Sequence, residues 1–142
     1  LLKRTLDPPQ ADQLLTWLEH HQERSWSLNL LLTPRGNHYE IETWHQKILL
    51  GMRAAELLLR LVIGRFSTPD GWISRAQTGI ASENISQRMS DLRMRLGPPP
   101  PNQKSWIEAD HHGHYRLCCP AGHILWNRNN LPSELGYLLN DR

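Results

Sequence analysis

The fold that we expect is decided by Ile85-Ser-Gln-Arg-Met-Ser-Asp-Leu-Arg-Met-Arg-Leu96 and, a little further along, by Trp106-Ile-Glu-Ala-Asp-His-His-Gly-His-Tyr-Arg-Leu117. In the first stretch, apolar residues recur every three or four positions, which predicts an amphipathic helix. The residues that form this apolar stripe are Ile85, Met89, Leu92 and Leu96, whereas Gln87, Arg88, Asp91 and Arg95 fall outside it. The second stretch alternates around a polar segment that contains Gly113, so it predicts two short strands joined by a turn.

A helix followed by such a hairpin is the arrangement of a winged helix. In that arrangement the helix enters the major groove of DNA, and the hairpin, or wing, reaches the backbone or minor groove beside it. The sequence therefore directs attention to nucleic acid as a partner.

Size and charge limit the alternatives. A chain of 142 residues with 39% hydrophobic content has room for one compact domain with terminal extensions. The net charge is only +2, but the segment from Gly51 to Lys104 holds eight basic residues against four acidic ones, a local net charge of +4. A basic segment that coincides with the proposed helix suits a polyanionic partner, although a solvated, arginine-rich helix face explains the same count.

Cysteine usage and hydropathy indicate the compartment. Cys118 and Cys119 are adjacent, so a disulfide between them would close no useful loop. The apolar runs are too short to span a bilayer, and no signal-peptide pattern opens the chain. We therefore expect a cytoplasmic protein with no membrane partner.

The remaining pattern predicts three regions. Residues 1–25 form a helical extension with a helix over 11–22, residues 26–118 form the DNA-binding domain, and residues 119–142 form a tail with a short helix over 131–139. Within the domain, strands are expected over 27–33 and 39–48, joined by the turn Pro34-Arg-Gly-Asn, with a bulge or a second turn near Glu42.

Capping residues predict where the helices begin and end. A helix over 52–63 is expected to stop at Gly64, and a short helix to run from the N-cap Ser74 to Gly79. The helix of the opening motif is expected to begin after the N-cap Ser82 and to stop at Gly97. The prolines 98–101 then form a stiff extended connector to the wing.

The motifs resemble the effector domain of OmpR/PhoB-type response regulators. The family's recognition helix reads close to V-D-V-H-I-S-R-L-R-R-K-L-G, and residues 85–97 keep its apolar frame, Ser90, Arg93 and the final Leu-Gly. Its wing reads close to Y-I-R-T-V-R-G-V-G-Y-R-L, against residues 106–117, and Trp72-Ile-Ser-Arg75 is similar to the V-V-S-R that opens its middle helix. The similarity covers roughly residues 27–117.

The resemblance implies an α+β fold: a winged helix-turn-helix preceded by a small antiparallel β-sheet, with the N-terminal helix as an extra element. It also implies a sequence-specific regulator of transcription that binds double-stranded DNA. The residues expected to contact DNA are Ser74, Arg75, Asn84, Ser86, Gln87, Arg88, Asp91, Arg95, Lys104, His111, His112, His114 and Arg116.

Departures from the family pattern keep a second hypothesis open. The wing has His111 and His112 where relatives carry a basic residue and a Gly-x-Gly, and Glu108 and Asp91 stand where relatives are often basic. Acidic groups that face phosphates weaken binding. The alternative is a winged-helix module for protein interaction, in which the terminal segments build a homodimer or a larger assembly and DNA contact is weak or absent.

Other chemistry is less favoured. A cluster that could suggest zinc consists of His111, His112, His114, Cys118, Cys119 and His123. However, zinc sites use two separated ligand pairs, adjacent cysteines coordinate one ion awkwardly, and strand alternation would send His111 and His112 to opposite faces. No nucleophile–base pair or phosphate loop is apparent, and Glu40 and Glu42 fit a solvated strand face. The six tryptophans fit core packing better than base stacking. We expect no enzyme activity, no metal and no cofactor.

Overall fold

A four-stranded sheet forms one side of the protein in the computed structural model, which describes residues 26–127, 129 and 131–139. The sheet has the order β3-β2-β1-β7, and its strands are β1 (Leu28–Arg35), β2 (His38–Thr43), β3 (Lys47–Gly51) and β7 (Ile124–Trp126). The first three strands are antiparallel, but β7 runs parallel to β1. The α+β class is thus confirmed. The sheet is mixed rather than antiparallel, because a strand from the expected tail joins its edge.

The strand expected over 39–48 is in fact two strands. The side-chain oxygen of Thr43 accepts hydrogen bonds from the backbone N–H groups of His45 and Gln46 and donates one to the Gln46 carbonyl. These local bonds turn the chain after β2, as the failed alternation near Glu42 suggested. Tyr39 and Ile41 are both buried in strict alternation, and only Trp44 breaks the pattern because it lies in the turn.

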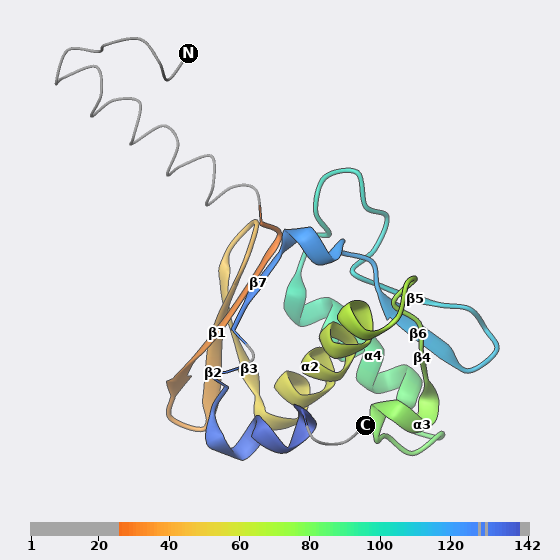
Figure 1. The fold of residues 1–142 in the computed structure, drawn as a ribbon, viewed down its shortest axis with the longest axis horizontal. Helices are drawn as coiled ribbons and strands as arrows, with labels where there is room; N and C mark the ends of the chain where they lie inside the picture. The colour runs from red at the N-terminus through yellow and green to blue at the C-terminus, as the bar shows by residue number, and fades with distance from the viewer. Residues whose placement is uncertain (1–25, 128, 130, 140–142) are drawn as a thin grey trace, which may run out of the picture.

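Helix α2 (Met52–Ser67) lies beside one face of the sheet, in the middle of the molecule (Figure 1). The prediction that it stops at Gly64 is wrong. A Cβ at Gly64 would lie 2.2 Å from Cγ2 of the Ile73 side chain, so this glycine permits close packing against the next strand. The helix ends one turn later, where Thr68 donates its backbone N–H and its hydroxyl to the Gly64 carbonyl.

The short helix after α2 is confirmed. Strand β4 (Ile73–Ser74) leads into α3 (Arg75–Thr78), whose N-cap Ser74 forms a capping box with Gln77. Gly79 ends this helix in the left-handed conformation, with a φ of 73°, which glycine adopts at little cost.

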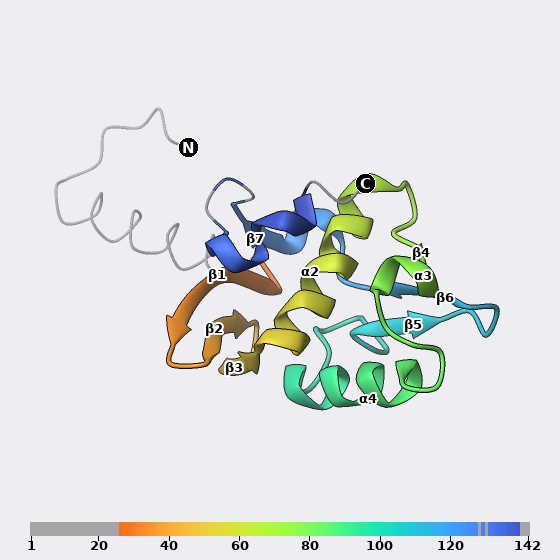
Figure 2. The same cartoon turned by 90° about the horizontal axis from the view of Figure 1, so that it is seen from below.

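Helix α4 (Ile85–Leu96) confirms the apolar stripe. Its four stripe residues are each no more than 4% exposed and belong to the hydrophobic core. Figure 2 shows α4 beside α2 and the β5–β6 hairpin. The expected N-cap is wrong, because Ser82 lies in a turn closed by the bond from Asn84 N–H to the Ala81 carbonyl. Asn84 therefore precedes the helix, and its side chain caps no backbone group.

The predicted hairpin consists of β5 (Ile107–Ala109) and β6 (His114–Leu117), and β6 also pairs with β4 to complete a three-stranded sheet. Its tip projects beyond the body of the protein (Figure 2). The connector from α4 is fixed at Pro98, whose carbonyl accepts hydrogen bonds from the indoles of both Trp44 and Trp106. This contact ties the end of α4 to the turn between β2 and β3.

The C-terminal segment packs against the body of the protein. After β6 come the 3-10 helix η1 (Ala121–His123), strand β7 and the 3-10 helix η3 (Ser133–Leu139). Leu135 and Leu138 of η3 are buried, and Glu134 accepts a hydrogen bond from the Tyr39 hydroxyl. The expected short helix is therefore present in 3-10 form.

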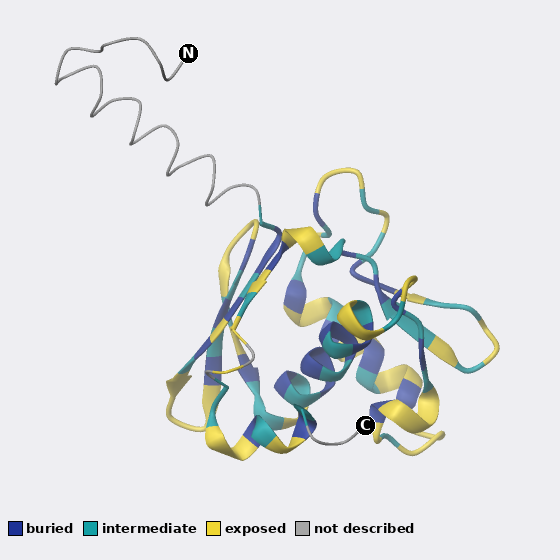
Figure 3. Ribbon diagram, viewed as in Figure 1, coloured by how far each residue is buried: buried dark blue, intermediate teal, exposed yellow. Residues whose placement is uncertain are grey.

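Buried residues gather where the four-stranded sheet, α2 and α4 face one another (Figure 3). The tryptophans only partly fit the predicted core packing, since Trp106 is 2% exposed but Trp44 is 39% exposed. Trp17 and the predicted helix over 11–22 lie outside the described residues. No helix in the described part of the chain is long and apolar enough to cross a membrane.

Candidate nucleic-acid interface

The outward face of α4 is the centre of the candidate interface. Opposite the apolar stripe, the helix exposes Ser86, Gln87, Ser90, Asp91 and Met94, and the Met94 side chain is 78% exposed. The Gln87 amide donates a 2.8 Å hydrogen bond to the Asp91 carboxylate one turn later. The face is therefore polar and open to solvent, with one large apolar side chain and one carboxylate that already has a partner.

Arginines occupy the two edges of this face. Arg88 and Arg95 lie on the edge beside the start of α2, where Arg53 joins them. Arg93 lies on the opposite edge and donates a 3.1 Å hydrogen bond to the Ile107 carbonyl of β5. The two edges thus differ, because only Arg93 is engaged by the neighbouring strand.

The residues before α4 that were predicted to contact DNA also differ in whether their side chains are already bonded. Ser74 is committed to capping α3, whereas the exposed side chain of Asn84 makes no capping bond. Arg75 is exposed, and its backbone N–H donates to the Gly113 carbonyl at 2.8 Å. That bond holds the base of the hairpin turn against the start of α3.

Asp110 organises the hairpin tip. One of its carboxylate oxygens accepts the backbone N–H groups of His112 and His114 at 2.7 and 3.0 Å, and the other lies 3.0 Å from Nδ1 of His114. His111 and His112 sit in the turn rather than on opposite faces of a strand, and both are exposed. Of the three predicted histidines, His114 already has a carboxylate partner.

The pKa of Asp110 follows from these contacts. Desolvation raises this pKa, but the backbone donors of His112 and His114 and the nearby His114 imidazole outweigh it. The net result is a pKa below the ordinary value for a carboxyl group. The negative charge on Asp110 thus stabilises the turn.

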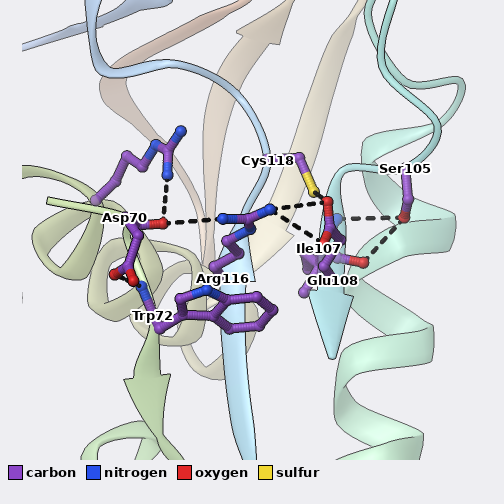
Figure 4. Close-up of polar contacts among 8 residues, drawn as sticks. Asp70, Trp72, Ser105, Ile107, Glu108, Arg116 and Cys118 are labelled. Atoms are coloured by element: carbon purple, nitrogen blue, oxygen red, sulfur yellow. Dashed lines mark hydrogen bonds and ion pairs between the residues drawn. The ribbon is translucent and has the colours of Figure 1, made fainter. Parts of the chain in front are cut away.

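Arg116 contacts three neighbouring residues of the protein (Figure 4). Its guanidinium lies 3.2 Å from the Glu108 carboxylate, donates to the Asp70 carbonyl at 3.3 Å and stacks 4.5 Å from the centre of the Trp72 ring. The prediction took this residue for a DNA contact. In the structure its contacts join the hairpin to the loop before β4.

The same carboxylate controls the neighbouring thiol. Cys118 donates to Glu108 at 3.3 Å, and this bond, with help from Arg116 and against desolvation, lowers the pKa of Glu108. Desolvation and Glu108 together raise the pKa of Cys118 to about 12, and desolvation raises that of Cys119 to about 11. Both cysteines are therefore protonated thiols at neutral pH. Within the described residues, no three His, Cys, Asp or Glu side chains gather as metal ligands.

Most of the predicted residues lie on or next to α3, α4 and the hairpin, while Lys104 is exposed in the connector. Sequence analysis missed Arg53 and His38, which lie beside α4 although they come from other elements. The position of Arg53 at the start of a predicted helix was the one available signal. No family model matches the chain, and no curated protein or solved structure is significantly similar to it.

Proposed function

We propose that this chain is a winged-helix domain that binds double-stranded DNA sequence-specifically and regulates transcription in the cytoplasm. Helix α4 enters the major groove, and the β5–β6 hairpin lies along the adjacent backbone or minor groove. The observation that carries the proposal is that α4 is anchored in the core by one face and exposes the opposite face to solvent. The stripe of α4 is buried, while the opposite face is exposed over its whole length.

The arrangement of elements supports this function. Helix α3 precedes α4 across a short turn, and the hairpin that follows is joined to β4 in one small sheet. This order matches the family that the sequence resembles. It presents a helix and a projecting hairpin together, which is how winged helices approach the duplex.

The side chains suited to reading bases lie in the first two turns of α4. Gln87 is exposed and can offer its amide to adenine, the standard bidentate partner of glutamine. Ser86 and Ser90 are exposed on either side and can bond to any base edge. On this proposal the Gln87–Asp91 bond opens, and Asp91 accepts from cytosine or remains at the edge of the contact.

Two steps test the proposal. First, the purified chain is incubated with a genomic fragment library at two salt concentrations, and the retained DNA is sequenced to identify a preferred site. Second, Gln87→Ala is expected to weaken binding to that site by about 1–3 kcal/mol while binding to random DNA changes little. Gln46→Ala is the matched control, because this exposed glutamine lies in the turn of the four-stranded sheet. Failure to retain any DNA, or equal affinities for Gln87→Ala and its parent, would contradict the proposal.

A second function is favoured by one observation. Met94 is 78% exposed on the outermost line of α4, with the carboxylate of Asp91 nearby, and an exposed methionine is typical of protein-binding surfaces. In that case α4 docks a second copy of the chain or another protein. Sedimentation measurements on the parent and on Met94→Ser distinguish the two: a dimer that Met94→Ser dissociates, without DNA binding in either protein, supports the assembly module.

A further inference from the structure

A groove runs between the start of α2 and the side of α4. It has a volume of about 740 Å³ and is also lined by His38 of β2 and Gly51 of β3. Figure 2 shows the start of α2 beside the C-terminal half of α4. A smaller cavity of about 240 Å³ continues the groove toward the loop between α3 and α4, and both share Arg53 and Arg88 in their walls.

The groove is strongly basic. Three arginines line it, Arg53 from α2 and Arg88 and Arg95 from α4. Its one carboxylate, Asp91, is already bonded to Gln87, and the carboxylate of the smaller cavity, Glu56, is paired with Arg60 at 3.4 Å. Across the described ranges, none of the three groove arginines forms an ion pair or a side-chain hydrogen bond.

Unpaired arginines that converge in a groove are suited to phosphate. A guanidinium offers several donors in a fixed fork and binds phosphate oxygens in bidentate fashion. Arg88 and Arg95 are seven residues apart, which is two helical turns and about 10 Å along α4. One strand of B-DNA places a phosphate every 3.4 Å or so of helix axis, so the two residues are spaced to meet different phosphates of one strand.

The position of the groove fits a duplex held by α4. The groove follows one edge of the exposed helix face, and the strand that borders the major groove passes there when the face contacts the bases. The opposite edge supplies less free charge, because Arg93 and Arg116 are bonded within the protein. The free guanidinium groups beside α4 therefore lie on the α2 side.

We infer that Arg53, Arg88 and Arg95 form a phosphate-binding groove that holds one DNA strand beside α4. This inference rests on the proposed function. The groove, and not the hairpin, provides most of the backbone attraction, and it acts equally on specific and random sequences because phosphates carry no sequence information.

The experiment measures affinity for a mixed-sequence DNA duplex over a range of salt concentrations. The variants are Arg53→Gln, Arg95→Gln and the double variant, which remove the positive charge but keep a polar side chain, and the control is Lys47→Gln on the far end of β3. Each lost phosphate contact is expected to reduce the slope of log K against log salt by about 0.9, and the double variant by about 1.8. Lys47→Gln is expected to leave the slope unchanged. Thermal melting of each variant confirms that it is folded.

The outcomes separate this inference from the proposed function. A parent that binds DNA while the double variant keeps its affinity and salt slope overturns the phosphate groove alone. A parent that binds no duplex overturns both proposals. Binding of poly-glutamate in place of DNA, lost in the double variant, would assign the groove to an acidic protein partner and also overturn the inference.

Discussion

Arginines lie along both edges of α4, but those on one edge are bonded within the protein and those on the other are not. On the hairpin side, Arg93 is bonded to a backbone carbonyl and Arg116 is held by a carboxylate, a carbonyl and an indole ring. On the α2 side, the three groove arginines have no such partners among the residues that the structure describes. The local net charge of the sequence predicted a polyanionic partner, but only the neighbours of each side chain decide which charges are available to it.

The bonds made by the hairpin have two consequences. The bonds of Arg116 leave its guanidinium less available to an anionic partner. Backbone bonds meanwhile fix the hairpin to β4 and to the start of α3. A fixed hairpin positions its tip without much conformational entropy to lose on binding. On our proposals, the hairpin side supplies shape and the α2 side supplies charge.

Both edges of α4 are held in place by its buried apolar stripe, so we expect a disruption of that stripe to have the largest effect on stability. Leu92 is 1% exposed, and Leu92→Asp places an unpaired carboxylate in the core. We expect a loss of about 4 kcal/mol or more in the free energy of unfolding, measured by denaturant titration. Ser90→Asp on the exposed face is the control and is expected to change stability by less than about 0.5 kcal/mol. Equal stability of the two variants would mean that the faces of α4 are assigned the wrong way round.

Close packing at Gly64 supports the hairpin side selectively. In Gly64→Ala the new methyl group meets the buried Ile73 of β4, which pairs with β6. Overpacking costs about 1–3 kcal/mol, and the higher helix propensity of alanine returns up to about 1 kcal/mol, so we expect a net loss of about 1–2 kcal/mol. Gly122→Ala has no neighbour within 4 Å of the added atom and serves as control. A neutral or stabilising Gly64→Ala would show that β4 has room to move.

Loss of the ion pair between Arg116 and Glu108 is expected to leave an available arginine on the hairpin side as well. Glu108→Gln removes the carboxylate that pairs with this arginine and costs little stability, because an exposed ion pair is worth about 1 kcal/mol at most. We expect affinity for DNA to rise several-fold, with a salt slope steeper by up to about 0.9. The gain should disappear when Arg116→Ala is added. Glu40→Gln, which removes a carboxylate paired with Arg35 on the other sheet, is expected to have no effect. No gain in Glu108→Gln would mean that the hairpin side does not approach phosphate.

Acid should loosen the hairpin tip before it affects the groove. Because the pKa of Asp110 is lowered in the folded protein, its contribution to stability is complete above the ordinary carboxyl value of about 3.9 and is lost as the pH falls below it. We expect the His112 and His114 amides to exchange faster with solvent below about pH 4, relative to their intrinsic rates. In Asp110→Ala this pH dependence should be absent. Identical profiles for the two proteins would remove Asp110 as the source of order in the turn.

The sequence by itself determined the features that depend on near neighbours. The stripe of α4, the N-cap Ser74 of α3, the end of α3 at Gly79 and the hairpin with its glycine turn were all predicted within a few residues. Periodicity and capping are local, since a helix or turn is closed by hydrogen bonds over three or four positions. The same locality explains the misplaced ends: Ser82 and Gly64 have the chemistry of a start and a stop, but contacts elsewhere in the chain set the bounds.

Only the tertiary structure decided the features that join distant parts of the chain. β7 lies parallel to β1 although about a hundred residues separate them, and Gly64 is needed because Ile73 packs on it. Arg116 is bonded to the carbonyl of Asp70, a partner 46 positions away, and Arg53 meets Arg88 and Arg95 across a groove between two helices. No periodicity encodes such pairs, because each side chain is satisfied by whichever group the packing brings near it.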